Sequence, residues 1–493
     1  MAREYRHPPS AASLTASMRD LGYSLETAIA DLVDNSISAS ASIIDIVCDM
    51  SSDQPVVSII DNGQGMTAKE LLAAMRHGSG NPRQHRSHHD LGRFGLGLKT
   101  ASFSQCRSLT VISTKHGAIC GAEWNLDRID TTDDWVLNIF EEADIQTLPH
   151  IERLGNQGTA VIWRELDRLV EDAEGEHRDE IVYEKLEAVG RHLALVFHLY
   201  ISGEVKGYSK LTININGHPI SAFDPFCRNN PATQHLPEEI VRIDNKEIRI
   251  QPYILPHHSR LSAKDYDYYS DRSDFISNQG SYIYRNGRLM AWGDWFRLAP
   301  KSEATKLARV RIDFPNSLDE EWTIDIKKSR ARPPHIVRER LRQILVKISE
   351  RSITVHKNRA QRLYKKNPVL FWERFIDQKG IIFSINSQHP LILSLKKELS
   401  KKNAQTFGLI LDSISASLPI EMIYSDYSTH PQKISTSPST NEDKLNILKN
   451  LKTVLYGNGP VDAKAFLDVV HSTNIFDGQI EIVEKFIKEI SVC

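Results

Sequence analysis

The sequence predicts an α+β fold whose two N-terminal domains precede a mostly helical C-terminal region. Several segments have apolar residues at helical spacing, and short apolar runs bounded by turn residues indicate buried strands between them. The length of 493 residues exceeds what one ordinary core accommodates, so at about 150 residues per domain we expect about three domains. We place them at 1–200, 201–348 and 349–493.

The first domain is expected to combine helices with a sheet. The segment LETAIADLVDNSISASA, which begins at Leu25, has helical periodicity, and a strand signal follows at 43–48. A second buried strand at 56–60 ends abruptly in a glycine turn. The polar segment 78–93 lacks periodicity and is longer than most connections, which is typical of a lid. Further helices are expected at 68–77, 97–104 and 178–200, and further strands at 108–114, 119–125 and 158–163.

Strand signals then resume and predict a second α+β unit to about residue 345. They lie at 211–215, 247–254, 281–284 and 310–314. Beyond this unit the pattern is mainly helical, interrupted by a Ser/Thr/Pro/Asn stretch at 427–442 that is typical of a linker.

Composition excludes several classes of protein. A formal net charge of -2 and 40% hydrophobic residues give no global sign of a nucleic-acid or membrane partner. No window contains eighteen uninterrupted apolar residues and the N-terminus lacks a signal sequence, so we expect a cytoplasmic protein. An odd, scattered cysteine set without a CxxC pair argues against a disulfide framework and a structural zinc site. The cysteines are Cys48, Cys106, Cys120, Cys227 and Cys493.

The first motif of chemical interest is Asp31-Leu-Val-Asp34-Asn35. Residues four apart share a helix face, so the Asp31 carboxylate could accept a proton from water while the Asn35 amide oxygen binds magnesium. Taken alone, the motif is more typical of a polar stripe on an exposed helix. Asp34 lies off the Asn35 face, and we expect it at the surface.

The second motif, DNGQGM from Asp61 to Met66, directly follows a buried strand. A carboxylate at a strand end can accept a hydrogen bond from the exocyclic amine of adenine and would repel the oxygen of guanine. Gly63 and Gly65 would let the backbone approach a nucleotide, with Met66 against the purine. The alternative is a plain Asp-Gly turn.

The third motif runs from Gly92 to Thr100 as GRFGLGLKT. Glycines that lead into a helix present backbone N–H groups to phosphate oxygens, and Lys99 or Thr100 could add donors. A lone GxxGxG is weak evidence. It is not a dinucleotide-binding fingerprint here because it follows a polar loop, and the chain also lacks GxxxxGK[ST].

Together, DLVDNSISASA, DNGQGM and GRFGLGLK resemble the N, G1 and G2 boxes of the gyrase, Hsp-type chaperone, histidine kinase and MutL (GHKL) ATPases, and GTAVIW resembles their final box. The resemblance implies a Bergerat fold, an α/β sandwich with a mixed sheet, that binds ATP and Mg²⁺. It implies Asp31 as general base and Asn35 as magnesium ligand. The implied nucleotide contacts are Asn35, Asp61, Gly63, Gly65, Met66, Gly92, Gly95, Gly97, Leu98, Lys99, Thr100 and Thr159.

One residue departs from the pattern of these ATPases. Most hydrolysing members of the MutL-like branch carry glutamate where this chain has Asp31. A displacement of about 1 Å can lower a rate on the order of 100-fold. The resemblance therefore predicts an ATPase whose hydrolysis is slow.

The second domain resembles the S5-like transducer of MutL, gyrase and MORC proteins. YIYRNGRLMAW is similar to its strand and turn, and Trp322-Thr-Ile-Asp-Ile-Lys-Lys328 is similar to the segment whose lysine reaches the γ-phosphate. This implies Lys328 as a catalytic residue that distinguishes ATP from ADP. A solvated basic turn is the alternative. The closest resemblance is to prokaryotic MutL/MORC-like ATPases, which are associated with DNA transactions, restriction-like systems and antiphage defence.

Partners are predicted from charge and from the resemblance. Segment 327–366 contains fourteen Lys/Arg and two Asp/Glu, which favours contact with duplex DNA, although amphipathic helices often have basic outer faces without any ligand. The leading prediction is a clamp that dimerises on binding ATP and acts on DNA. The alternative is a nucleotide-switched scaffold with negligible hydrolysis. Region 349–493 has no recognisable catalytic motif and is expected to pack, dimerise or bind a partner such as an effector nuclease or helicase.

Overall fold

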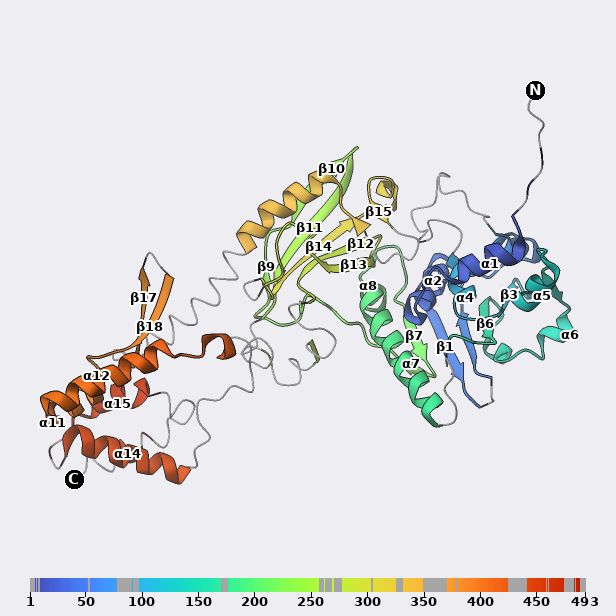
Figure 1. Cartoon of the computed structure of the whole chain (residues 1–493). Helices are drawn as coiled ribbons and strands as arrows, with labels where there is room; N and C mark the ends of the chain where they lie inside the picture. The colour runs from blue at the N-terminus through green and yellow to red at the C-terminus, as the bar shows by residue number, and fades with distance from the viewer. Residues whose placement is uncertain are drawn as a thin grey trace. The chain divides into compact units, whose positions relative to one another are not determined.

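The computed structural model describes residues 5, 7, 9–51, 54–77, 91, 97–169, 176–256, 261, 268–269, 277–302, 305–324, 331–348, 370–377, 380–423, 441–457, 459, 461–473, 483 and 485–487. The chain divides into two compact units, Met1–Ser349 and Glu350–Cys493. Figure 1 labels the elements of both.

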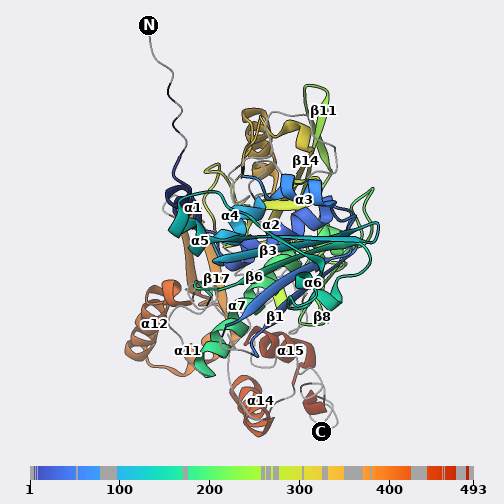
Figure 2. The ribbon, with the colours of Figure 1, turned by 90° about the vertical axis from the view of Figure 1, so that its right-hand side faces the viewer.

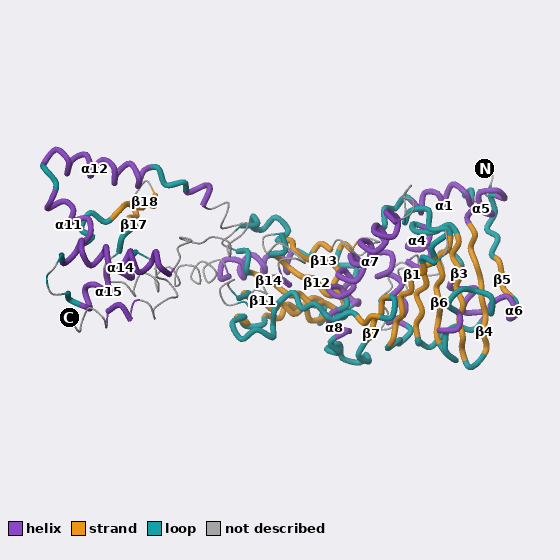
Figure 3. Tube along the Cα trace, turned by 90° about the horizontal axis from the view of Figure 1, so that it is seen from below, coloured by secondary structure: helices purple, strands orange, loops and turns teal. Residues whose placement is uncertain are grey.

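The first unit contains an eight-stranded mixed sheet in the order β5-β4-β3-β6-β2-β1-β7-β8. Its strands lie side by side in Figure 3. Neighbouring strands are antiparallel except β1 and β7, which are parallel. The strands are β1 (Ile43–Asp49), β2 (Val56–Asp61), β3 (Ser108–Lys115), β4 (Ala118–Asn125), β5 (Asn138–Phe140), β6 (Gly158–Arg164), β7 (Thr212–Ile215) and β8 (His218–Pro219).

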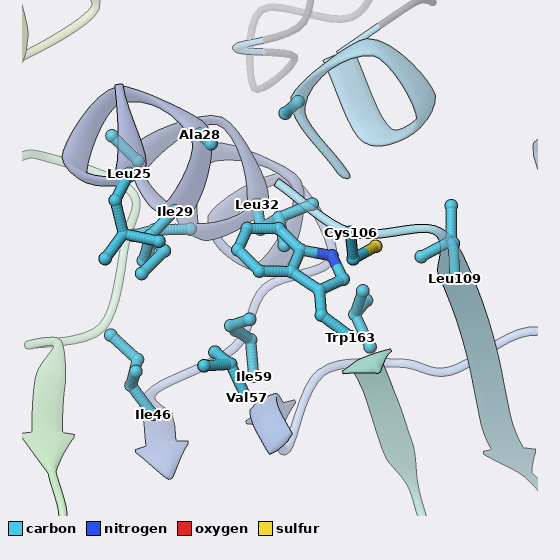
Figure 4. Packing of buried hydrophobic residues seen from close by; sticks show 14 of the residues in the cluster. Leu25, Ala28, Ile29, Leu32, Ile46, Val57, Ile59, Cys106, Leu109 and Trp163 are labelled. Atoms are coloured by element: carbon cyan, nitrogen blue, oxygen red, sulfur yellow. The ribbon is translucent and has the colours of Figure 1, made fainter. Parts of the chain in front are cut away.

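Helices cover one face of this sheet and enclose the main core (Figure 2). Alternation along the strands turns every second residue toward the helices. Trp163 of β6 and Ile59 of β2 thus meet Leu32 of α2 (Figure 4). The helices of this domain are α1 (Ala11–Arg19), α2 (Leu25–Ser38), α3 (Ala68–Met75), α4 (Gly97–Phe103), α5 (Leu126–Thr132), α6 (Glu142–Ile145), α7 (Glu176–Val196) and α8 (His198–Ile201). Of these, α6 packs against the opposite face of the sheet through Ile145.

A second sheet follows in the same unit, in the order β10-β11-β14-β12-β13, with β9 also paired to β11. A helix over 335–348 contributes Val337, Leu341 and Ile348 to the core of this sheet. The strands are β9 (Gln234–His235), β10 (Glu239–Ile243), β11 (Lys246–Ile254), β12 (Gly280–Arg285), β13 (Arg288–Asp294) and β14 (Ala308–Phe314). A separate pair joins β15 (Thr323–Ile324) to β16 (Ala331–Arg332).

The C-terminal unit is mostly helical. Leu448, Phe466 and Val470 are buried in its core together with Val483 and Phe486. Its helices are α11 (Pro390–Glu398), α12 (Lys401–Ala416), α14 (Asn441–Tyr456) and α15 (Ala463–Ser472). Throughout the described chain, no helix combines the length and the apolar character needed to cross a membrane.

The predicted α+β class with a helical C-terminal region is confirmed, and three details differ. The strand predicted at 211–215 exists as β7, but it pairs with β1 and extends the first sheet, because its apolar side chains complete that core. The helix predicted at 178–200 is interrupted after Val196. The C-terminal unit also contains an antiparallel hairpin, β17 (Trp372–Asp377) with β18 (Gly380–Ile385), which the helical pattern did not predict.

Candidate nucleotide site

Three polar residues form a row across neighbouring strands on the helix-covered face of the first sheet. In β2, Val57 and Ile59 belong to the main core, so Asp61, two residues further, faces the same side. Thr159 of β6 pairs in register with Asp61 and with Ser113 of β3. The apolar stripe of each strand thus ends in a polar side chain at one edge of the core.

Asp61 is held by hydrogen bonds from two sides. One carboxylate oxygen, Oδ2, accepts from the Ser36 hydroxyl of α2 at 2.7 Å, and Oδ1 accepts from the Gly63 backbone N–H at 2.8 Å. Burial raises the pKa of Asp61 above its usual value, while these donors and a backbone hydrogen bond from Thr159 oppose the rise. The carboxyl is therefore fixed in direction, and since a carboxylate has about four lone-pair sites it can accept another donor.

Ser113 connects the rest of this row. Its hydroxyl donates to the Gly158 carbonyl at 3.0 Å, accepts from the Met66 backbone N–H at 2.8 Å, and contacts the Thr159 hydroxyl at 2.9 Å. The glycine turn after β2 is thereby fastened to β3 and β6. Met66, Thr159 and Asp61, which the sequence predicts around one base, lie together.

The turn after β2 also packs against the end of α2. Gln64 donates its backbone N–H to the Ala39 carbonyl at 2.9 Å, and a Cβ on Gly63 would lie 2.8 Å from the same oxygen. Gly65 has φ +64°, and a Cβ there would lie 2.0 Å from the Thr114 carbonyl oxygen. Only glycine fits this position.

Asp31 is buried on α2, with 2% of its surface exposed. The Tyr23 hydroxyl donates to its Oδ2 at 3.1 Å. Gly97, the first residue of α4, lies against the same carboxylate, because a Cβ on Gly97 would be 3.4 Å from Oδ2. The first and third motifs, 66 residues apart, therefore meet at one carboxylate.

Asn35 is exposed one helical turn beyond Asp31, and its amide has no hydrogen bond to a described residue. Its backbone carbonyl accepts from Ala39 at 2.9 Å at the end of the helix. Because the Asn35 side chain is exposed, its amide oxygen can contact a ligand. An amide oxygen suits Mg²⁺, which prefers oxygen ligands and keeps several waters.

The structure does not place the Lys99 and Thr100 side chains as phosphate donors. Both are buried in α4. Lys99 donates to the carbonyls of Ala74 at 2.7 Å and Arg76 at 2.9 Å, where a cation complements the C-terminal end of α3. Burial lowers the pKa of Lys99 to about 8. Leu98 packs partly buried against the main core. A phosphate role for the Lys99 and Thr100 side chains would require these contacts to be released, and it remains a prediction.

Three predicted site residues, Gly92, Gly95 and Lys328, lie outside the described residues. The predicted lid also lies outside them, apart from Leu91. Leu91 is buried, and its backbone N–H donates to the Ser38 hydroxyl at 3.2 Å.

The expectation that Asp34 lies at the surface was wrong. Asp34 is fully buried, and Arg288 of β13 donates Nε to both of its carboxylate oxygens, at 3.1 and 3.0 Å. The sequence did not reveal this pair, because its partners are 254 residues apart. Breaking such a buried pair by removing one partner costs about 3–5 kcal/mol.

Sequence reasoning also missed three hydroxyl residues of the site: Tyr23, Ser36 and Ser113. Ser36 follows Asn35 directly, and its position between the first two motifs was the available signal. Ser113 and Tyr23 carry no such signal, because pairing between strands and packing between helices place them.

Comparison with known proteins agrees with this arrangement. Residues 23–159 match a family model described as "Histidine kinase-, DNA gyrase B-, and HSP90-like ATPase". No curated protein matches the chain. The matched range begins at Tyr23 and ends at Thr159, and it contains Asp31, Asn35, Asp61 and Gly97. The match, the mixed sheet and the joined motifs support a GHKL-type ATPase domain over residues 23–159, a domain type that binds ATP.

Proposed function

We propose that this protein is a Mg-ATP-dependent ATPase in which Asp31 activates the attacking water. The observation that carries the proposal is the position of the Asp31 carboxylate, buried on α2, oriented by the Tyr23 hydroxyl and in contact with Gly97 of the phosphate motif. A general base has to lie within reach of the water that it deprotonates. Hydrolysis would transfer the γ-phosphoryl group of ATP to water and release ADP and phosphate, with the water proton passing to Asp31.

Adenine recognition is proposed for Asp61. The Ser36 and Gly63 donors orient its carboxylate, and Thr159 and Met66 lie beside it. The exocyclic amine of adenine would donate to this carboxylate. The oxygen at the same position of guanine would face an acceptor, and an unpaired buried acceptor costs about 1–3 kcal/mol.

Magnesium is proposed to bind at Asn35. The exposed amide oxygen of Asn35 fits the metal, and the remaining ligands would be phosphate oxygens and water. Bound Mg²⁺ supplies charge neutralisation of the phosphates. Asn35 is the one protein ligand that we assign to it.

The proposed role of ATP is to gate a homodimeric clamp in a DNA transaction, of a MutL/MORC-like kind with restriction-like or antiphage defence as its setting. The basic segment 327–366 supports DNA contact through its charge. Its described part offers less support, because three of its basic residues are already paired. Arg340 and Lys347 pair with Glu239, and Arg342 pairs with Glu339. DNA binding would therefore depend on the other residues of the segment.

The deciding experiment is steady-state phosphate release from Mg-ATP by wild-type protein and by Asp31→Asn, with and without duplex DNA. We expect slow wild-type turnover and a loss of about 100-fold or more in the variant, with ATP affinity retained. Stimulation by DNA supports the clamp. Equal turnover by the two proteins contradicts the role of Asp31.

The second candidate is a nucleotide-switched scaffold with negligible hydrolysis. It is favoured by the shorter carboxylate at Asp31 and by apolar residues exposed on α12, where Leu409 is 68% exposed and Ile410 50%. Large exposed apolar side chains mark binding surfaces when they lie together. Tight ATP binding without turnover, unaffected by DNA, would support the scaffold. Turnover that depends on Asp31 would exclude it.

A further inference from the structure

Two arginines flank the tight turn between β12 and β13. Asn286 and Gly287 form the turn with φ of 49° and 85°, as a two-residue hairpin of this kind requires. Arg285 and Arg288 pair in register on either side of the turn and are almost fully buried. We call residues 285–288 the arginine turn. Two buried cations side by side need acidic partners, and each has one.

One side chain of the arginine turn, Arg288, contacts α2. Arg288 binds both carboxylate oxygens of Asp34, and its guanidinium lies 5.8 Å from the centre of the Phe197 ring. Asp34 is three residues after Asp31 and directly precedes Asn35. A shift of β13 along its axis would therefore act on the helix that carries the proposed base and the proposed magnesium ligand.

The other side chain, Arg285, contacts the segment before the phosphate motif. Arg285 forms a two-point pair with Asp319, at 2.7 and 2.6 Å, and its remaining Nη1 donates to the Leu91 carbonyl at 3.0 Å. Leu91 directly precedes Gly92. The pair with Asp319 fixes the guanidinium within its own domain, so the bond to Leu91 transmits the position of the second sheet to this backbone.

The contacts of Arg285 and Arg288 are connected to each other through Ser38, so that the hydrogen bonds form a closed chain. The Leu91 backbone N–H donates to the Ser38 hydroxyl at 3.2 Å, and that hydroxyl donates to the Asp34 backbone carbonyl at 2.8 Å. Asp34 in turn accepts from Arg288, which the turn joins to Arg285. Both sides of the proposed nucleotide site are thus fixed to four consecutive residues of the second sheet.

We infer that the arginine turn couples the nucleotide site to the second sheet, with Arg285 and Arg288 acting as positioning residues. Nucleotide binding that moves α2 or Leu91 has to move β12 and β13 or break this network. The inference rests on the proposed ATP binding at residues 23–159. It adds a route between the two sheets that does not pass through Lys328.

Hydrogen–deuterium exchange of the full chain, with and without a nonhydrolysable ATP analogue and Mg²⁺, tests the inference. In the wild type we expect protection of both α2 and residues 280–294. Arg288→Lys keeps the positive charge but loses the several N–H donors of the guanidinium. In this variant we expect protection of α2 to persist and protection of 280–294 to fall at least twofold. The kcat for ATP should fall roughly 10- to 100-fold, because Asp31 is displaced, whereas the affinity for the analogue should change less than about threefold.

Arg311→Lys is the matched control. Arg311 makes a two-point pair with Asp313 within β14, at 2.7 and 2.8 Å, and its guanidinium lies 5.0 Å from the centre of the Tyr284 ring in the neighbouring strand β12. This variant perturbs the second sheet comparably and should keep nucleotide-dependent protection of 280–294. If Arg288→Lys does not fold, Arg285→Lys carries the same test through Leu91.

The two possible failures are distinguishable. A wild type that does not bind the analogue overturns both the proposed function and the coupling. A wild type that binds it, with 280–294 protected equally in wild type and Arg288→Lys, overturns the coupling alone. A loss of protection that also occurs in Arg311→Lys reflects a weakened second sheet and likewise overturns it.

Discussion

Gly97 lies directly against the carboxylate of Asp31, so that a Cβ on the glycine would be 3.4 Å from Oδ2. If Asp31 acts as the proposed base, the first residue of α4 and a buried residue of α2 define the space for the attacking water. The dimensions of that space depend on the absence of a side chain at residue 97.

The effect of a substitution at Gly97 on turnover should depend on the size of the new side chain. In Gly97→Ala the new methyl makes an ordinary van der Waals contact with Asp31, so we expect turnover to fall only a few-fold. In Gly97→Val the branched side chain displaces the carboxylate, and a displacement of about 1 Å lowers the rate on the order of 100-fold. Phosphate release at saturating Mg-ATP, with an unchanged unfolding midpoint for both variants, measures the difference. Similar rates for alanine and valine would contradict it.

Ser36 should contribute to adenine binding through Asp61. Ser36→Ala removes a hydrogen bond to a carboxylate, worth about 1.5–3 kcal/mol, and frees Asp61 to turn away from the base. We expect the Kd for ATP to rise about tenfold or more and the preference for ATP over GTP to fall. Titration of both nucleotides by calorimetry checks this. Ser17→Ala is the control, because Ser17 is exposed on α1 and bonds only within its helix. An ATP preference unchanged in Ser36→Ala would remove Asp61 from base selection.

Gly65 and Gly117 offer a test of the glycine turn. Both have positive φ, +64° and +80°, but a Cβ on Gly117 meets nothing within 4 Å whereas one on Gly65 would lie 2.0 Å from the Thr114 carbonyl oxygen. Gly117→Ala should cost only the backbone strain of about 1–2 kcal/mol. Gly65→Ala adds a clash with backbone, so its loss of unfolding free energy should be at least twice as large. Chemical denaturation measures both values, and equal losses would refute the close approach.

Acid should destabilise the protein through two half-buried histidines. Burial, together with the nearby Lys99 charge, lowers the pKa of His77 to about 4, and burial lowers the pKa of His192 to about 4. Because these folded pKa values lie below the unfolded value of about 6.5, the unfolded chain binds more protons between pH 6.5 and pH 4. The free energy of unfolding therefore falls as the pH falls through this window.

His77→Phe should remove part of that pH dependence. The ring of His77 lies among Phe103, Trp124 and Trp135, with centroid distances of 4.4–5.6 Å, so phenylalanine suits the site. We expect the fall in unfolding free energy between pH 6.5 and pH 4 to shrink by roughly 1–3 kcal/mol. Urea denaturation at several pH values measures it. The exposed His218→Gln is the control, and an equal change there would contradict the assignment to His77.

The sequence predicted what depends on local pattern and on motifs. Apolar periodicity located α2, β2 and β6, and the order of the three motifs brought Asp31, Asp61 and Gly97 into one hypothesis. It failed where long-range pairing decides. Asp34 seemed to be a surface residue, because nothing near it in the sequence identifies Arg288 as its partner. The contacts of Lys99 with the end of α3 were likewise not visible in the sequence, and its phosphate role remains a prediction.

The pairing of β7 with β1 determines how far the chain must extend for the nucleotide-binding domain to be produced alone. A shortened protein that ends at residue 200 lacks β7. Four residues of β1 would then have no neighbouring strand for backbone hydrogen bonds on that side of the sheet. Unpaired strand edges promote association between molecules. Such a fragment should precipitate or form aggregates, whereas one that extends through Pro219 keeps the edge covered.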